Sequence, residues 1–150
     1  MQNSRDTAAG TAERSALVRA LLAYGEARRA ATADARRLLS LNELDARALL
    51  FVADNPGARP SHVRDHLGIT SAGVTTLIDR LVQRGAVRRD LDGDDRRVTH
   101  ITAVVDLDAE PWCALRAFDA AIERGVAGIP SAEADALARA LDEVVAAAAS

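Results

Sequence analysis

Apolar residues recur at three- and four-residue intervals along most of the chain, which is the spacing of one face of an α-helix. The clearest stripe would bury four side chains, Val74, Leu77, Ile78 and Leu81. A shorter helix is expected just before it, over about 61–67. Gly68 suits the left-handed residue that ends a helix, and the Thr70 hydroxyl can cap the next one. The pattern therefore predicts two helices joined by a tight turn.

The period of the pattern changes after Gly85, where the second helix is expected to end. Residues 86–89 and 98–102 are predicted to be short strands, the second of them rich in β-branched side chains. Asp92-Gly93 between them is typical of a turn. A helix-turn-helix followed at once by a hairpin is a winged helix, whose exposed second helix can enter the major groove of DNA.

Further helices are expected before this segment. A disordered start over 1–12 should lead into a helix over about 13–39. A second helix should begin after Asn42 as its cap and end near residue 55. Four of its residues, spaced for one helix face, are predicted to face the core: Leu44, Ala48, Phe51 and Val52.

Two more helices are expected after the hairpin. The first should cover about 109–126 and be capped by Asp106 or Asp108, and the last should be capped by Ser131. The stripe of the first comprises Trp112, Leu115, Phe118 and Ile122. The predicted fold class is therefore mainly α with a small β-hairpin wing, a winged helix-turn-helix with additional terminal helices.

The chain of 150 residues is expected to form a single domain over 1–150, with a winged-helix lobe over 41–104. The amphipathic helices over 13–39 and 109–148 carry more apolar surface than so small a lobe can cover. We therefore expect them to pair with a second copy in a homodimer. The alternative is a monomer whose helices pack on their own core.

The net charge of −3 argues mildly against a nucleic-acid partner, because such proteins are usually basic. Residues 59–97, however, contain eight arginines and six acidic residues and so carry a net charge of +2, while the rest of the chain carries −5. The single cysteine, Cys113, excludes an internal disulfide. With no apolar leader and no membrane-length apolar run, we expect a cytoplasmic protein without a membrane partner.

The exposed side of the second helix offers small residues to DNA bases, namely Ser71, Ala72, Thr75 and Thr76. Hydroxyls can bond several bases and a methyl group can touch thymine, but neither makes a bidentate pair. Direct discrimination should therefore be modest, with a large share left to DNA shape.

Arginines are the other candidates for DNA contact. At the wing tip, Arg96 and Arg97 could reach phosphates or the minor groove. A second group could contact the DNA backbone: Arg64, Arg80, Arg84, Arg88 and Arg89. Some of the second group are expected only to pair with nearby acids at positions 65, 79 and 90.

Several of these segments together resemble the MarR family of bacterial transcription regulators. They are residues 67–70, 74–75, 78–81, 84–87 and 94–97, within a resemblance that covers about 41–102. Asp95 and Arg97 match the Asp-x-Arg of the family's wing, which implies that Asp95 braces Arg97. The family's Leu-Thr pair after the wing is replaced by Ala103-Val104, so the next helix is expected to begin elsewhere.

The resemblance implies a dimer built by the terminal helices that binds a palindromic operator in double-stranded DNA. It also implies a repressor relieved by a small lipophilic or phenolic effector, bound between the dimer helices and the DNA-binding lobe. The aromatic residues available for such a pocket are Tyr24, Phe51, Trp112 and Phe118.

Other functions remain as alternatives. A winged helix can be a protein-interaction module without DNA binding, and Cys113 could make the chain a redox-sensing regulator. His62 and His66 lie four residues apart, but no third ligand joins them, so neither a metal nor another cofactor is expected. The sequence contains no glycine-rich phosphate loop, metalloprotease motif or nucleophile elbow, so an enzyme is not expected.

Overall fold

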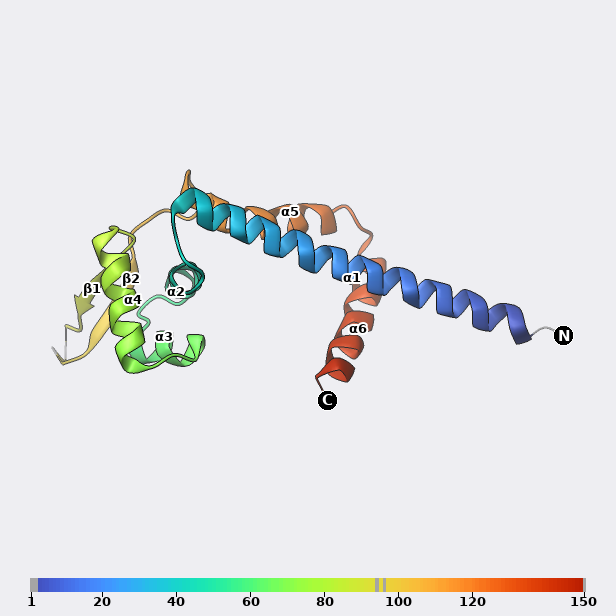
Figure 1. Cartoon of the computed structure of the whole chain (residues 1–150), viewed down its shortest axis with the longest axis horizontal. Helices are drawn as coiled ribbons and strands as arrows, with labels where there is room; N and C mark the ends of the chain where they lie inside the picture. Colours follow the sequence, from blue (N-terminus) through green and yellow to red (C-terminus); the bar gives the residue numbers. More distant parts are fainter. Residues whose placement is uncertain (1–2, 94, 96, 150) are drawn as a thin grey trace. The chain divides into compact units, whose positions relative to one another are not determined.

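The computed structural model describes residues 3–93, 95 and 97–149, with side chains from residue 16 onward. Its elements are, in chain order, α1 (Asn3–Leu39), α2 (Glu43–Asp54), α3 (Pro60–Leu67), α4 (Ser71–Gln83), β1 (Val87–Leu91), β2 (Thr99–Ala103), the short 3-10 helix η1 (Trp112–Leu115), α5 (Ala117–Val126) and α6 (Ser131–Ala148) (Figure 1). The mainly helical fold with one hairpin confirms the predicted fold class.

The chain divides into two compact units, Met1–Leu115 and Arg116–Ser150. The first contains the winged helix-turn-helix together with α1 and η1, and the second contains α5 and α6. The expectation that residues 1–150 form one domain stays a prediction.

The core of the first unit lies among α2, α3, α4 and the hairpin. The predicted stripe of α4 is confirmed, because Val74, Leu77, Ile78 and Leu81 are all buried. Val63 of α3 and Ile101 of β2 are fully buried beside them. These apolar contacts hold the two helices of the helix-turn-helix against each other and against the wing.

The predicted ends of the two central helices are also confirmed. Gly68 follows α3 with a φ of 67°, the left-handed region that a residue without Cβ adopts at no steric cost. The Gly73 amide donates to the Thr70 hydroxyl oxygen at 3.1 Å, which satisfies one free amide at the start of α4. This cap and turn set the angle at which α4 leaves α3.

The wing is an antiparallel pair in which Val87 lies opposite Ala103 and Leu91 lies opposite Thr99. Both strands lie one or two residues further along the chain than predicted. The Ile101 amide donates to the Ala58 carbonyl at 2.7 Å, so β2 is joined to the loop before α3. The hairpin is therefore anchored to the helices at its base.

Some expectations for the helices near the N-terminus are wrong. Helix α1 begins at Asn3 rather than near Glu13, and no proline in residues 3–12 interrupts it. In α2, Asn42 caps the helix as predicted by accepting from the Asp45 amide at 2.8 Å. Leu44, however, is exposed and does not belong to the core face.

The predicted helix over 109–126 is also wrong in its first half. The chain turns at Asp106, whose carboxylate accepts from the Asp108 amide at 2.8 Å, and η1 and then α5 follow. Pro111 accounts for the break, because proline lacks an amide and restricts the residue before it. The predicted cap of α6 is also wrong. Ser131 is the first residue of the helix, the cap position is Pro130, and no side-chain bond caps the helix there.

Candidate nucleic-acid interface

The first half of α4 presents one polar side to solvent. Ser71, Ala72, Thr75 and Thr76 are all exposed, whereas the opposite side of the helix is buried in the core. The structure thus brings the four predicted base-reading residues together on one surface. Their side chains are short, which allows close approach of a helix to base edges.

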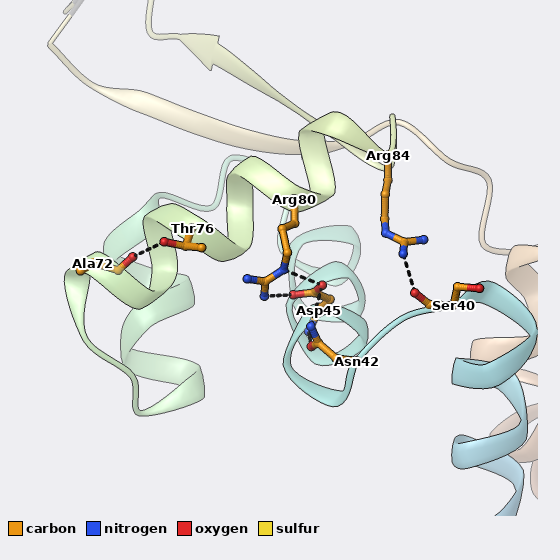
Figure 2. A network of polar contacts seen from close by, with 7 residues as sticks. All are labelled: Ser40, Asn42, Asp45, Ala72, Thr76, Arg80 and Arg84. Atoms are coloured by element: carbon orange, nitrogen blue, oxygen red, sulfur yellow. Dashed lines mark hydrogen bonds and ion pairs between the residues drawn. The ribbon is translucent and has the colours of Figure 1, made fainter.

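The two threonines bond back to their own helix. The Thr75 hydroxyl donates to the Ser71 carbonyl at 3.0 Å. The Thr76 hydroxyl donates to the Ala72 carbonyl at 3.1 Å, as Figure 2 shows. Since a hydroxyl has one hydrogen, each oxygen is left with acceptor capacity only.

Arg80 is directed toward α2 (Figure 2). Its guanidinium makes two bonds to Asp45, Nε to Oδ2 at 3.1 Å and a terminal nitrogen to Oδ1 at 2.5 Å. The Asn42 amide also donates to Asp45 Oδ2 at 2.9 Å. Hydrogen bonding to the Asp45 carboxylate raises the pKa of Arg80 above its usual value. Arg80 is therefore engaged in an ion pair within the protein, and its predicted DNA contact stays a prediction.

The partner of Arg80 was missed by sequence reasoning, although a signal was present. Asp45 lies four residues before Leu49 and seven before Val52, so it shares their buried face. Its side chain is only 4% exposed. A buried carboxylate requires a cation or several donors, so an acid on a core face indicates a distant basic partner.

Arg84, one helical turn after Arg80, connects α4 to the end of α1. It donates to the Leu39 carbonyl oxygen at 3.1 Å. It also donates to the Ser40 carbonyl oxygen at 2.6 Å (Figure 2). The last carbonyls of a helix lack partners within it and carry partial negative charge, so a guanidinium is favoured there. Ser40 has a φ of 51°, the left-handed conformation that terminates α1. Two arginines thus attach α4 to the α1–α2 junction.

Three other candidate arginines pair with acids, as expected for part of the set. Arg64 binds Asp65 at 2.7 Å, Arg88 binds Asp90 at 2.8 Å, and Arg89 binds Asp79 at 2.7 Å. These surface pairs are screened by solvent and can exchange for phosphate contacts.

The tip of the wing is held by acids that accept from backbone amides. The Asp95 amide donates to Asp92 at 3.2 Å, and the Arg97 amide donates to Asp95 at 3.0 Å. Asp95 therefore braces the backbone of Arg97. The Arg97 side chain is exposed, and no acid among the described residues pairs with it. Arg96 lies outside the described residues.

His100 of β2 links the wing tip to the loop before α3, a role that sequence reasoning missed. Its Nε2 lies 2.8 Å from an Asp92 carboxylate oxygen and its Nδ1 lies 2.8 Å from the Gly57 carbonyl. Both partners only accept, so the ring satisfies both when it carries two protons. The bond to Asp92, with that to Gly57, raises the pKa of His100.

The predicted pocket aromatics have different surroundings. Phe51 stacks on His66 with ring centroids 4.3 Å apart, and Trp112 packs against the core of the first unit. Tyr24 is exposed on α1, whereas Phe118 belongs to α5 in the second unit. A shared effector pocket stays a prediction.

The remaining candidate chemistry is limited in the part of the chain that the structure describes. Cys113 is a half-buried free thiol in η1. His62 accepts from the Arg59 amide through Nδ1 at 3.3 Å. No group of three His, Cys, Asp or Glu side chains able to hold a metal occurs among the described residues. No helix in the same ranges is long and apolar enough to cross a membrane.

Solved structures similar to this chain include proteins bound to DNA. FabT from Streptococcus pneumoniae in complex with DNA has 18% identity and a TM-score of 0.66, covering 89% of this chain and 94% of that chain. A mutant of MepR from S. aureus bound to an oligodeoxyribonucleotide has 18% identity and a TM-score of 0.58, covering 89% and 96%. At these identities the likeness shows the fold alone.

A third similar structure holds a small molecule. CouR from Rhodococcus jostii RHA1, bound to p-coumaroyl-CoA, has 26% identity and a TM-score of 0.52, covering 83% of this chain and 87% of that chain. No curated protein sequence matches the chain significantly.

The exposed α4, packed on α3 and followed by the hairpin, defines a winged helix-turn-helix. A sequence model described as the MarR family matches residues 39–98, which contain α2, α3, α4 and β1 and end just before β2. The match confirms the resemblance to the MarR family that these residues show in the sequence.

Proposed function

We propose that this chain is a dimeric regulator of transcription that binds double-stranded DNA, with α4 in the major groove and the wing beside it. The observation that carries the proposal is the arrangement of exposed side chains on these two elements. Thr75 and Thr76 lie on the outer side of α4, while Arg97 at the wing tip is exposed and has no acidic partner among the described residues. The DNA-bound FabT and MepR structures share this fold.

Dimerisation through the terminal helices is part of the proposal. On α1, Val18 and Leu22 are 54% and 64% exposed, and on α6 Val145 is 65% exposed. Apolar side chains repeated along amphipathic helices favour burial against another surface. A two-fold dimer would present two α4 helices to successive major grooves, which fits a palindromic operator.

We further propose that the regulator represses transcription and that a small lipophilic or phenolic molecule relieves the repression. CouR, which shares 26% identity with this chain, is bound to p-coumaroyl-CoA, whose acyl group is a phenol. An effector can change DNA affinity only if it binds the DNA-competent and DNA-incompetent states differently. p-Coumaroyl-CoA is therefore a suitable first probe. It should raise the unfolding temperature and weaken DNA binding together, and stabilisation with unchanged DNA affinity would argue against an effector role.

The DNA-binding proposal is tested by the salt dependence of binding. Arg97→Ala should weaken binding to all duplexes and reduce the slope of log affinity against log salt by about one unit per lost phosphate contact, so by about two units for a dimer with two wings on the DNA. Arg97→Lys keeps the charge and should retain the slope, which makes it the matched control. Unchanged affinity and slope in Arg97→Ala would show that the wing does not touch DNA. Failure of the wild-type chain to bind any duplex would overturn the whole proposal.

A further inference from the structure

Helix α4 presents no bidentate guanine-reading group on its exposed first half. A bidentate bond to guanine O6 and N7 requires arginine or lysine. The only such residue in α4 is Arg80, whose guanidinium is bound to Asp45. In a helix-turn-helix, residues near the start of the second helix meet the base edges. That position is occupied by Ser71, Ala72, Thr75 and Thr76.

The two threonine hydroxyls have a defined hydrogen-bonding role. Each hydroxyl hydrogen is donated to the carbonyl four residues earlier in the helix. The oxygen can therefore accept a hydrogen bond from a base but has no hydrogen left to give. Each side chain also carries a methyl group. The base edge that fits such a side chain combines an amino donor with an apolar group.

Of the two kinds of base pair, A·T meets this requirement. In the major groove, adenine offers its N6 amino group and thymine its C5 methyl group. A G·C pair also offers one amino group, on cytosine, and both kinds of pair present two acceptors, but G·C carries no methyl group. The preference is therefore set by the thymine methyl group beside an amino donor, a combination that only A·T presents.

We propose that Thr75 and Thr76 read A·T base pairs, accepting from adenine N6 through the hydroxyl oxygen and contacting the thymine methyl through Cγ2. The inference rests on the proposed DNA-binding function and names the base edges that α4 recognises. It assigns specificity to acceptor oxygens and methyl groups in a helix whose one arginine is bound within the protein.

The experiment uses the full-length chain and duplexes that it retains from a randomised pool. A·T pairs should be enriched, and replacing single thymines by deoxyuridine should identify the contacted positions. Loss of one buried methyl contact should weaken binding about fourfold. At a G·C pair placed in the same position, 5-methylcytosine should bind about fourfold more tightly than cytosine, because it restores the methyl group beside an amino donor.

Two variants separate the methyl contact from the hydrogen bond. Thr76→Ser keeps the hydroxyl and loses the methyl, so it should become insensitive to deoxyuridine at one position. Thr76→Val keeps the methyl and loses the oxygen. It should stay sensitive to deoxyuridine and become insensitive to replacement of the paired adenine by purine, which lacks the N6 amino group. Both changes are small on an exposed helix, so both variants should fold.

Thr32 provides the matched control, since its hydroxyl donates to the Arg28 carbonyl at 2.8 Å in α1. Thr32→Val removes the same kind of bond and should leave both sensitivities at wild-type values. Enrichment of G·C pairs, absence of any deoxyuridine effect, or full deoxyuridine sensitivity in Thr76→Ser would each overturn the inference while DNA binding stands. Failure to retain any duplex would overturn the DNA-binding proposal itself.

Discussion

The Arg80–Asp45 ion pair offers a sharp stability test because its two ends differ in exposure. The Asp45 side chain is 4% exposed and the Arg80 side chain is 42% exposed. Arg80→Met would leave a buried carboxylate whose remaining side-chain donor is the Asn42 amide. Asp45→Asn would leave an arginine that can reach water. The loss of Arg80 should therefore cost more free energy of unfolding than the loss of the Asp45 charge.

The magnitude follows from the exposure of the pair. Removing one partner of a fully buried pair costs about 3–5 kcal/mol. Because Arg80 is partly solvated and Asn42 still donates, we expect Arg80→Met to cost about 2–3 kcal/mol. For a chain of this size that is a fall of about 5–10 °C in unfolding temperature. Asp45→Asn should cost about 1 kcal/mol.

Thermal unfolding followed by circular dichroism measures these shifts, at one protein concentration because a dimer's unfolding temperature depends on it. The double variant Arg80→Met/Asp45→Leu should recover most of the stability, since replacing both ions by apolar groups is often nearly neutral. Equal costs for the two single variants, or a double variant as unstable as their sum, would refute the reasoning. The dependence of log DNA affinity on log salt should be the same for the double variant as for wild type. A slope reduced by about one unit per subunit would show that Arg80 contacts phosphate.

Three further predictions concern other parts of the chain. Asp92 and Gly57 raise the pKa of His100 above its ordinary 6.5, so the protonated ring should stabilise the fold fully below that pH and progressively less as pH rises through the raised pKa. Urea midpoints should therefore fall over that window in wild type, and an equal fall in His100→Gln would contradict this. Ser40→Gly should stabilise the fold by about 0.5–1 kcal/mol and Gly68→Ala should destabilise it by about 1 kcal/mol, because both positions have positive φ; opposite signs in urea titrations would be inconsistent with the backbone argument. Deleting all residues after Pro130 should abolish the dimer in sedimentation experiments, and a truncated chain that remains dimeric would place the interface elsewhere.

The sequence by itself determined the elements whose causes are local. Thr70, Gly68 and Asn42 act on amides or backbone angles within three residues, so their roles could be predicted from type and position. The α4 stripe repeats with the helical period, and a helix of that period has one buried face wherever it packs. The break near Pro111 is equally local, because proline lacks an amide and restricts the residue before it. The apolar stripe over 112–122 by itself predicts an unbroken helix there and carries no sign of this break.

Tertiary structure alone decided which side chains remain available to a partner. Arg80 meets Asp45 across 35 residues of sequence, and Arg84 meets Leu39 across 45. No periodic pattern encodes such pairs, because they depend on how α2 and the end of α1 pack against α4. The same packing joins His100 to Gly57 across 43 residues. The positions of the arginines could be read from the sequence. Their partners could not, because a guanidinium binds whichever carboxylate or carbonyl the folded chain brings within reach.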